Sequence, residues 1–547
     1  MKINLTFLLL LCCVAGCSQD IPVAQQTQID SVFKAYTQPG SPGVAVLIIK
    51  DGNVVFKKGY GLASLEYNIQ VSTTTVFDIA SVSKQFTGFA ISTLIQQGKI
   101  SPDDDIHKYL PDVPQFNKPM TIRNLIHHTS GLRDWPAGLH AAGWRWDEAF
   151  SYDDIMRMVS KQRDLDFEPG SQYSYSNTGY NLLAAIVAKV SSKTFPDWIA
   201  ENIFKPLGMN SSQVLSDYSN VVKNLAGSYS PSGRGYSKNN DELTAWGSSS
   251  IVTTAEDLSK WMINFQRSLD KRDPVYLRMI ETDLLNNGQK NNYAYGLAVG
   301  DNNGIRNIQH DGGWAGFRTI ISNYPDEKLS IILLSNHGNF DSGANADAIA
   351  QLFLKHKLKA GPARPDINSL PTIKVDSSIL KKYTGTYQLG TGWYATFTLE
   401  DGKLMVQANG ENKFSTDLKT DTSLWVPAYG ASVTFTGITD KAGALKYKDI
   451  NAKRIVPIKA DLSQLNEYAG SYYSPELEAS YRLTVENGKL VAHHMRLGDF
   501  AFDPDIAIAG GFSSYNGNIA FYKNGQNKVS GFKLTNGRIK NIVFNKQ

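Results

Sequence analysis

The sequence predicts an α+β domain followed by two small all-β barrels, and three observations support this fold class. Apolar, β-rich runs stand at both ends of residues 25–358 with helical patterns between them, which is typical of an antiparallel sheet that carries a helical region. Residues 359–375 contain repeated prolines and are typical of a linker. Beyond the linker, short aromatic strands and glycine turns form a pattern that occurs twice, in residues 376–460 and 461–547.

Hydrophobic periodicity places the elements of the α+β domain. Apolar, β-rich runs bounded by turn residues predict two hairpins, over 43–49 with 54–56 and over 317–324 with 329–335. Apolar residues at helical spacing predict helices between and after them, as over 180–190, 255–265 and 344–358. Because strands from both ends of the domain enclose the helices, we expect the two hairpins to share one sheet.

The two barrels are predicted from an internal repeat. Residues 380–387 (LKKYTGTY) match residues 465–472 (LNEYAGSY), and residues 400–404 match residues 486–490. The two copies lie about 85 residues apart, and each has a run of short strands joined by hairpin turns. Neither copy contains a motif with catalytic chemistry, so the chemistry is expected in residues 25–358.

Residues 1–16 are predicted to be an export signal. Met1-Lys2 precedes an apolar run that is about half of the roughly 20 residues a membrane-spanning helix needs. The segment ends at Cys17 and resembles the lipobox of bacterial lipoproteins. This resemblance implies cleavage before Cys17, a lipid on that cysteine, and attachment to a membrane of the bacterial cell envelope, facing the periplasm or exposed at the outer membrane. Since the other cysteines, Cys12 and Cys13, also lie here, the mature domains have no disulfide.

Length and charge limit the classes of function. At 547 residues the chain exceeds one ordinary domain. The net charge is only +4, and no basic tract with interleaved aromatic residues occurs. We therefore expect no nucleic-acid partner, and the net charge indicates no other class of partner.

Ser81 and Lys84 are the first candidate catalytic residues. Three positions apart, they share one face of a helix, where a lysine amine can activate a serine nucleophile. Apolar residues at helical spacing follow the pair and Gly98 ends the pattern, so Ser81 is expected in the first turn of a buried helix. The same spacing recurs without this context at Ser31/Lys34, Ser268/Lys271, Ser378/Lys381 and Ser530/Lys533.

Two further segments can complete a catalytic site. Taken alone, each also has the composition of an ordinary loop or turn. Tyr175 and Asn177 would project to one side of an extended segment, where a tyrosine can relay a proton and an asparagine can hold a substrate carbonyl. His310-Asp311-Gly312-Gly313 opens the C-terminal hairpin. Glycines there let a ligand approach the strand, and the Gly313 amide can bind an oxyanion together with the Ser81 amide.

In this order, the three segments resemble the motifs of the serine β-lactamase and penicillin-binding protein family, in its branch with class C β-lactamases, D-aminopeptidases and related esterases. Ser81-Val82-Ser83-Lys84 matches the nucleophile motif and Tyr175-Ser176-Asn177 the Tyr-x-Asn motif. His310-Asp311-Gly312 stands where members have Lys-Thr-Gly or His-x-Gly. Secondary matches within residues 25–355 are the segment 125–132, Pro169-Gly170, the segment 206–209 and Asn336.

The resemblance implies a β-lactamase/transpeptidase-like domain, two lipocalin-like barrels as in the D-aminopeptidases, and acyl transfer through a serine ester without metal or cofactor. Ser81 would be the nucleophile, and Lys84 and Tyr175 would move its proton. The substrate would be bound by Asn177, His310, Asp311, Gly312 and Gly313.

The third motif also bears on the substrate. An imidazole and a carboxylate in place of the ammonium and hydroxyl of Lys-Thr-Gly should weaken binding of a substrate carboxylate. We therefore expect poor β-lactamase and D,D-carboxypeptidase activity, and hydrolysis of amide bonds in small or D-residue peptides. An esterase of short acyl esters, and a β-lactamase or D,D-carboxypeptidase, are the alternatives within the family. A penicillin-binding sensor without turnover is the alternative from another class.

No other catalytic arrangement is indicated. The chain has no His-Glu-x-x-His or Gly-x-Ser-x-Gly sequence, and the adjacent His127 and His128 cannot share one face of a helix or strand. Metal catalysis and an α/β-hydrolase fold are therefore not expected.

Overall fold

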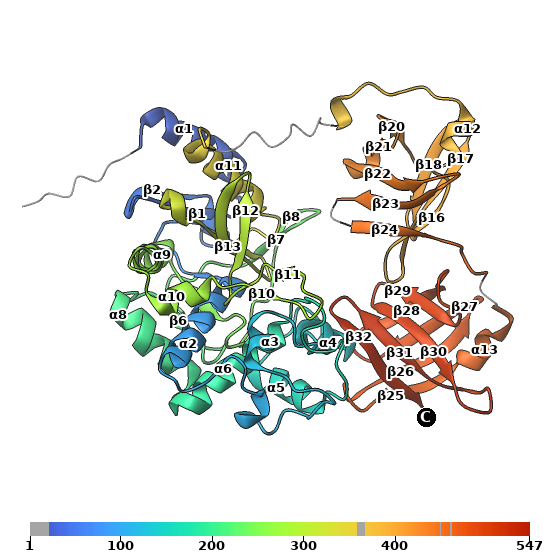
Figure 1. The fold of residues 1–547 in the computed structure, drawn as a ribbon, viewed down its shortest axis with the longest axis horizontal. Coiled ribbons are helices and arrows are strands. Elements are labelled where there is room, and N and C mark those ends of the chain that lie inside the picture. The colour runs from blue at the N-terminus through green and yellow to red at the C-terminus, as the bar shows by residue number, and fades with distance from the viewer. Residues whose placement is uncertain (1–20, 358–366, 449, 460–461) are drawn as a thin grey trace, which may run out of the picture.

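The computed structural model describes residues 21–357, 367–448, 450–459 and 462–547. The predicted signal at 1–16, Cys17 and the first part of the linker at 359–375 lie outside these residues. Figure 1 shows a larger mixed domain up to α11, followed by two β-rich domains. No helix in the described part of the chain combines the length and the apolar character needed to cross a membrane.

A six-stranded antiparallel sheet organises the first domain, in the order β12-β13-β14-β15-β1-β2. β1 pairs with β15, so that Val44 lies opposite Ser335. Both predicted hairpins are confirmed, and they share one sheet as expected. The strands are β1 (Val44–Lys50), β2 (Asn53–Tyr60), β12 (Ala298–Asn302), β13 (Ile305–Trp314), β14 (Phe317–Tyr324) and β15 (Leu329–Ser335).

The central strand β1 is buried on both faces, which explains its continuous apolar sequence. Val44, Val46 and Ile48 pack toward α1 (Val23–Val32) and α11 (Ser342–Leu354), while its alternate residues pack against the helical region. Figure 1 shows α1 and α11 together on one side of the sheet. α11 begins two residues before the predicted start because Asp341 accepts a hydrogen bond from the Ala344 amide and caps the helix.

The helical region covers the other face, where Phe86 of α2 packs on Trp261 of α9 with ring centroids 4.8 Å apart. Its helices are α2 (Lys84–Gln96), α3 (Ile122–Ile126), α4 (Trp135–Ala141), α5 (Tyr152–Lys161), α6 (Asn177–Ser191), α7 (Phe195–Ile199), α8 (Lys205–Leu207), α9 (Ala255–Asp270) and α10 (Pro274–Met279). Its short strands are β3 (Leu62–Ser64), β4 (Ile69–Gln70), β5 (Phe77–Asp78), β6 (Gln213–Val214), β7 (Tyr229–Ser232), β8 (Gly235–Lys238), β9 (Ile251–Thr253), β10 (Asp283–Leu284) and β11 (Lys290–Asn291).

The two β-rich domains follow the repeat in the sequence. In the second, strands β25 to β32 form a closed barrel, and in the first, a nine-stranded sheet runs from β19 round to β20. The first barrel contains α12 (Ser377–Leu380), β16 (Gly385–Gly390), β17 (Trp393–Glu400), β18 (Lys403–Ala408), β19 (Phe414–Ser415), β20 (Asp417–Leu418), β21 (Ser423–Val426), β22 (Ala431–Ile438), β23 (Ala442–Tyr447) and β24 (Ile450–Ile455). The second contains α13 (Leu465–Tyr468), β25 (Gly470–Ser474), β26 (Ala479–Glu486), β27 (Lys489–His494), β28 (Gly498–Pro504), β29 (Gly511–Ser514), β30 (Gly517–Lys523), β31 (Val529–Asn536) and β32 (Ile539–Lys546).

The repeated residues make the same contacts in both barrels. The buried Tyr387 hydroxyl donates to the Tyr383 carbonyl at 3.1 Å, and the buried Tyr472 hydroxyl donates to the Tyr468 carbonyl at 2.8 Å. The Asp401-Gly402 and Asn487-Gly488 turns both have two residues at positive φ, the conformation that suits a tight hairpin. The repeat therefore encodes one structural unit twice.

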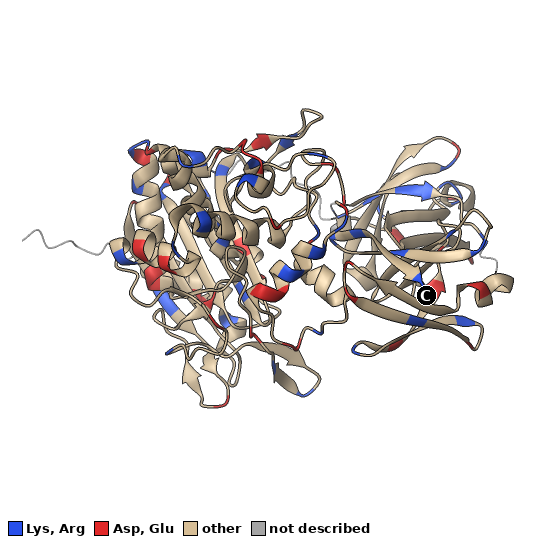
Figure 2. Ribbon diagram, turned by 90° about the horizontal axis from the view of Figure 1, so that it is seen from below, with Lys and Arg blue, Asp and Glu red and all other residues tan. Residues whose placement is uncertain are grey.

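The second barrel docks on the helical region beside α4 and α5 (Figure 1). The Tyr481 hydroxyl donates to the Ala141 carbonyl at 2.9 Å, and the Lys540 amide donates to the Asp166 carboxylate at 2.7 Å. The buried Arg133 side chain forms ion pairs with both Asp166 and Glu476. Basic and acidic residues are interspersed over the domains in Figure 2, in keeping with the small net charge.

Candidate active site

A 3₁₀ turn, η2 (Ala80–Ser83), presents Ser81 just after β5. Ala80 adopts φ +46°, and its amide donates to the Asp78 carboxylate at 2.6 Å, which holds the turn. The prediction placed Ser81 in the first turn of the helix, whereas the structure begins α2 at Lys84. The left-handed Ala80 bends the chain sharply out of β5, so one 3₁₀ turn precedes the helix. Ser81 and Lys84 still face one another.

Lys84 is fully buried, and its Nζ atom contacts three oxygens. They are Asn177 Oδ1 at 2.8 Å, the Ser248 carbonyl at 2.7 Å and Ser81 Oγ at 3.0 Å. The two carbonyl oxygens can only accept hydrogen bonds, so two N–H groups of the amine donate to them. Burial lowers the pKa of Lys84 well below its usual range, with Asp134 opposing and Arg538 reinforcing that shift. In the neutral amine the remaining lone pair faces Ser81 and can take its proton.

Tyr175 and Asn177 both line the cavity at Ser81, and Ser176 between them has the extended backbone that was predicted. Asn177 is the first residue of α6, and Tyr175 lies in the loop before it. The Tyr175 hydroxyl is buried, and it forms no hydrogen bond within the described residues. Burial raises the pKa of Tyr175, and the neighbouring Ser81 side chain offsets this only partly. Tyr175 is therefore a protonated phenol at neutral pH, able to donate to a bound group.

Strand β13 forms the opposite wall. Its pairing with β12 ends at Gln309, so residues 310–314 pair only with β14 and leave one edge toward the cavity. A Cβ added at Gly312 would lie 2.4 Å from the Ile79 carbonyl and 3.2 Å from the Ser81 amide nitrogen. Only glycine lets β13 lie this close to the turn that holds Ser81, next to the Gly313 amide.

His310 is buried in β13 as a neutral imidazole. Its Nδ1 donates to the Asp311 carbonyl at 2.6 Å, so Nε2 accepts from the Tyr293 hydroxyl at 2.8 Å. Burial, reinforced by Lys84, lowers the pKa of His310 to about 4. The Asp311 side chain, in contrast, is exposed at the cavity. No cation thus stands in β13 where relatives with Lys-Thr-Gly carry one.

These residues enclose a cavity of about 510 Å³. Its lining includes the polar residues Ser81, Tyr175 and Asn177. It also includes apolar and aromatic residues, namely Leu243, Trp135, Trp146, Tyr173 and Trp314. Such a combination suits a small ligand that has an apolar side group next to the bond to be cleaved.

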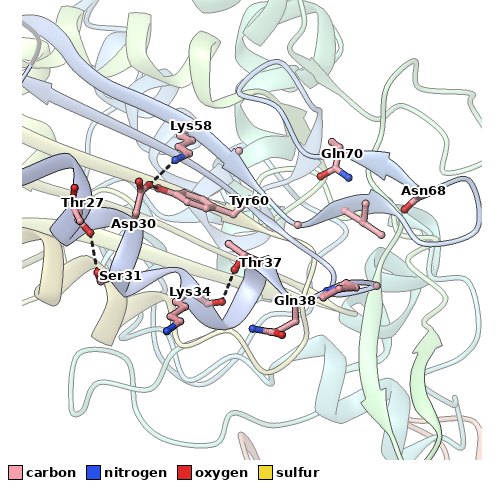
Figure 3. Close-up of a pocket in the computed structure, with 15 residues that line it drawn as sticks. Thr27, Asp30, Ser31, Lys34, Thr37, Gln38, Lys58, Tyr60, Asn68 and Gln70 are labelled. Carbon is pink, nitrogen blue, oxygen red and sulfur yellow. Dashed lines mark hydrogen bonds and ion pairs between the residues drawn. The ribbon is translucent and has the colours of Figure 1, made fainter. Parts of the chain in front are cut away.

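A larger cavity of about 740 Å³ lies elsewhere, along α1 and β2 (Figure 3). There Asp30 accepts hydrogen bonds from Lys58 at 2.8 Å and from the Tyr60 hydroxyl at 2.6 Å. Asp30 is thus paired with both neighbouring polar groups, and the lining of this cavity includes no serine next to a buried amine. We therefore place the chemistry at Ser81.

Sequence reasoning missed three residues that contact the candidate site. His128 was dismissed with His127, yet its ring lies 4.3 Å from the rings of both Tyr175 and Tyr293. Asp134 and Arg538 form an ion pair beside Asn177 and Tyr175. No local pattern marks these residues, because each reaches the site through tertiary packing.

A serine beside a buried amine and a tyrosine on this scaffold is the arrangement that a serine hydrolase needs. The sequence matches the protein family described as Beta-lactamase over residues 29–354, and the chain belongs to that family. The predicted family, fold class and enzyme type are thereby confirmed. These findings leave the role of each site residue as a proposal.

Individual relatives cover different shares of the chain. Penicillin-binding protein 4* of Bacillus subtilis (strain 168) is 26% identical over 464 residues, 80% of this chain and 99% of that protein. A D-aminopeptidase of Cereibacter sphaeroides (strain KD131 / KCTC 12085) is 28% identical over 327 residues, 59% of this chain and 62% of that protein, less than two thirds of its length. The crystal structure of D-amino acid amidase from Ochrobactrum anthropi SV3 complexed with D-phenylalanine shares the fold, with a TM-score of 0.53 and 21% identity over 61% of this chain and all of that chain.

Proposed function

We propose that the protein is an exported hydrolase that cleaves amide bonds of small amine-bearing or D-residue substrates through an acyl-serine intermediate. The observation that carries this proposal is the Asp311 carboxylate. It is exposed at the cavity that contains Ser81, and within the described residues it takes part in no hydrogen bond or ion pair through its side chain. A carboxylate there suits a substrate ammonium group and repels a substrate carboxylate. A D-aminopeptidase among the relatives supports the same substrate class.

The geometry supports a division of roles between the two titratable groups at Ser81. Their environments move the two pKa values in the directions that a base and an acid need, with that of Lys84 lowered and that of Tyr175 raised. Ser81 Oγ would attack the substrate carbonyl carbon while its proton passes to the Lys84 amine. The Tyr175 hydroxyl would give its proton to the leaving amine as the C–N bond breaks, and would regain one from the Lys84 ammonium.

A water molecule would complete the cycle. It would attack the ester carbon and give its proton to Lys84, and the released Ser81 oxygen would recover that proton. The amides of Ser81 and Gly313 are the proposed oxyanion donors, since Gly312 brings their two segments together. Asn177 would hold the Lys84 amine and the substrate carbonyl side by side.

We also propose that export leaves the chain anchored at the bacterial cell envelope through a lipid on Cys17. The support is the short apolar run that ends at this cysteine in the sequence. Substrates reached there would include small peptides of the envelope or its surroundings.

A substrate panel tests the proposed activity. We expect steady turnover of D-amino acid p-nitroanilides, weaker turnover of L-anilides and short p-nitrophenyl esters, poor hydrolysis of nitrocefin, and none of these reactions in Ser81→Ala. A single burst with a stable adduct would instead support the sensor, and efficient hydrolysis of nitrocefin or a D-Ala-D-Ala peptide would support the β-lactamase or carboxypeptidase.

Asp311→Asn tests amine recognition directly. With D-phenylalanine p-nitroanilide we expect KM to rise about 10- to 100-fold, because a charge-assisted hydrogen bond is lost. With 3-phenylpropionic acid p-nitroanilide, which lacks the amine, KM should stay within about twofold. Asp326→Asn is the control, since Asp326 pairs with Arg306 on the surface of the same domain. Equal effects on both substrates would contradict the assigned role of Asp311.

A further inference from the structure

The second barrel places one of its own side chains in the cavity at Ser81. The turn between β31 and β32 consists of Gly537 and Arg538, and Arg538 lines the cavity together with Ser81. Its guanidinium group lies 4.8 Å from the centre of the Tyr175 ring, and Nη1 lies 3.0 Å from Asp134 Oδ2. Arg538 is half-exposed with 52% of its side chain accessible, whereas Asp134 keeps only 3%.

Hydrogen bonds continue from Asp134 to the candidate base. Asp134 Oδ1 accepts from the Asn177 amide at 2.7 Å and from Asn177 Nδ2 at 3.0 Å. Asn177 Oδ1 then accepts from Lys84 Nζ at 2.8 Å. Arg538 is therefore connected to Lys84 through two intervening side chains, and Nζ in turn lies 3.0 Å from Ser81 Oγ.

The barrel holds Arg538 in place through contacts on either side of the turn. Asp134 donates its backbone N–H to the Arg538 carbonyl at 3.4 Å. Two residues further on, Lys540 donates its amide to Asp166, which also pairs with the buried Arg133. The position of the guanidinium thus depends on the docked barrel.

We propose that Arg538 is a positioning residue of the active site. Arg538 holds Asp134 and, through Asp134 and Asn177, keeps the Lys84 amine within hydrogen-bond distance of Ser81. This inference rests on the proposed function of Lys84 as the base. A buried carboxylate is costly unless it is paired, and Arg538 supplies the opposite charge. Without that charge, the buried cluster of Asp134 and Lys84 would take up a proton to stay neutral. A proton on Lys84 removes the base, and a proton on Asp134 removes an acceptor for Asn177.

The charges around Lys84 support this balance. Asp134 raises the pKa of Lys84, Arg538 lowers it, and Asp311 of β13 raises it to a smaller extent. Burial lowers the pKa of both neighbouring histidines, so these are neutral in the working range. The titratable and charged groups that face Lys84 are Asp134 before α4, His128 after α3, Tyr175 before α6, Tyr180 in the first turn of α6, His310 and Asp311 of β13, and Arg538 of the barrel.

The expected effect is a shift in the pH dependence of kcat/KM. Activity requires neutral Lys84, so it is lost as pH falls through the Lys84 pKa, and a raised pKa moves this acidic limb to higher pH. We expect Arg538→Ala to move the limb up by about one pH unit or more, and Asp134→Asn to move it down. The double variant should return close to the wild-type limb, and Arg538→Lys should restore most of it because the positive charge is kept.

Three measurements separate positioning from other roles. The pH profiles are recorded with the anilide that carries an amine and with the anilide that lacks it, and thermal unfolding is followed for each variant. Arg482→Ala is the matched control, since Arg482 is an exposed arginine on β26 of the same barrel and should leave the profile unchanged. Equal shifts for both substrates, with opposite signs for the two single variants, would support the proposal.

Two results would overturn it. An unchanged acidic limb in Arg538→Ala would show that Lys84 does not depend on this arginine. A rise in KM for either anilide, without a change in the limb, would make Arg538 a substrate-binding residue instead. Retained turnover in Ser81→Ala would contradict the proposed function itself, so the two failures are distinguishable.

Discussion

Replacing Lys84 by methionine is expected to lower kcat by about a thousandfold or more while the protein remains folded. The lysine is fully buried, and methionine fills a similar volume without the nitrogen. Ser81 would keep its place in the 3₁₀ turn but would lose the group that accepts its proton. Initial rates on the best substrate of the panel and thermal unfolding measure the two effects separately.

Lys419→Met is the matched control for this variant. Lys419 is also a buried lysine, but it lies in the first barrel and donates to the Leu370 carbonyl at 3.0 Å. Its replacement should change the melting temperature and leave kcat unaffected. If Lys84→Met keeps more than about a tenth of wild-type kcat, Lys84 is not the base, because loss of a general base removes at least about a hundredfold.

Replacing Gly312 by alanine is expected to lower kcat by about a hundredfold, the second largest effect. The added Cβ would lie 2.4 Å from the Ile79 carbonyl and 2.4 Å from the Thr319 hydroxyl, so β13 must move away from the turn that holds Ser81. That movement would separate the Ser81 and Gly313 amides, which are the proposed oxyanion donors. Steady-state kinetics with one anilide and one ester measure the loss, which should be similar for both because the defect lies in the transition state.

Gly300→Ala provides the comparison for Gly312. Gly300 lies in β12 of the same sheet, and an added Cβ there meets no atom within 4 Å. This control should retain wild-type kcat and show that a glycine-to-alanine change in the sheet is harmless in itself. Full activity in Gly312→Ala would mean that the close approach of β13 is not needed for catalysis.

Much of the fold could be predicted because the signals are local. Apolar, β-rich runs and turn residues place the hairpins of the sheet, and the paired Tyr387 and Tyr472 contacts show why the repeat predicts two similar barrels. The helix start after Ser81 was less predictable, since it depends on a left-handed Ala80 and on the Asp78 side chain. Tyr175 and Asn177 were expected on an extended segment; Ser176 between them is extended, but the segment ends there because Asn177 begins α6.

The residues of the candidate site also fall into those that local motifs predict and those that only the tertiary structure brings together. Ser81, Lys84, Tyr175, Asn177 and the segment 310–313 could be named from their motifs, because each is a short pattern of chemically specific residues. The Asp134–Arg538 pair could not, since its members are 404 positions apart and belong to different domains. His128 gave no usable signal either, because a histidine beside a second histidine has no periodicity that points to a site.

The sequence by itself determined the fold class and the repeat, and it singled out Ser81 and Lys84 as the candidate nucleophile and base, since these depend on residue type and on spacing along the chain. Only the tertiary structure decided that Lys84 is buried, that β13 lies against the serine turn, and that the second barrel brings Arg538 to Asp134. The reason is physical: burial and charge balance depend on which distant segments exclude water from a side chain, and spacing along the chain carries no such information.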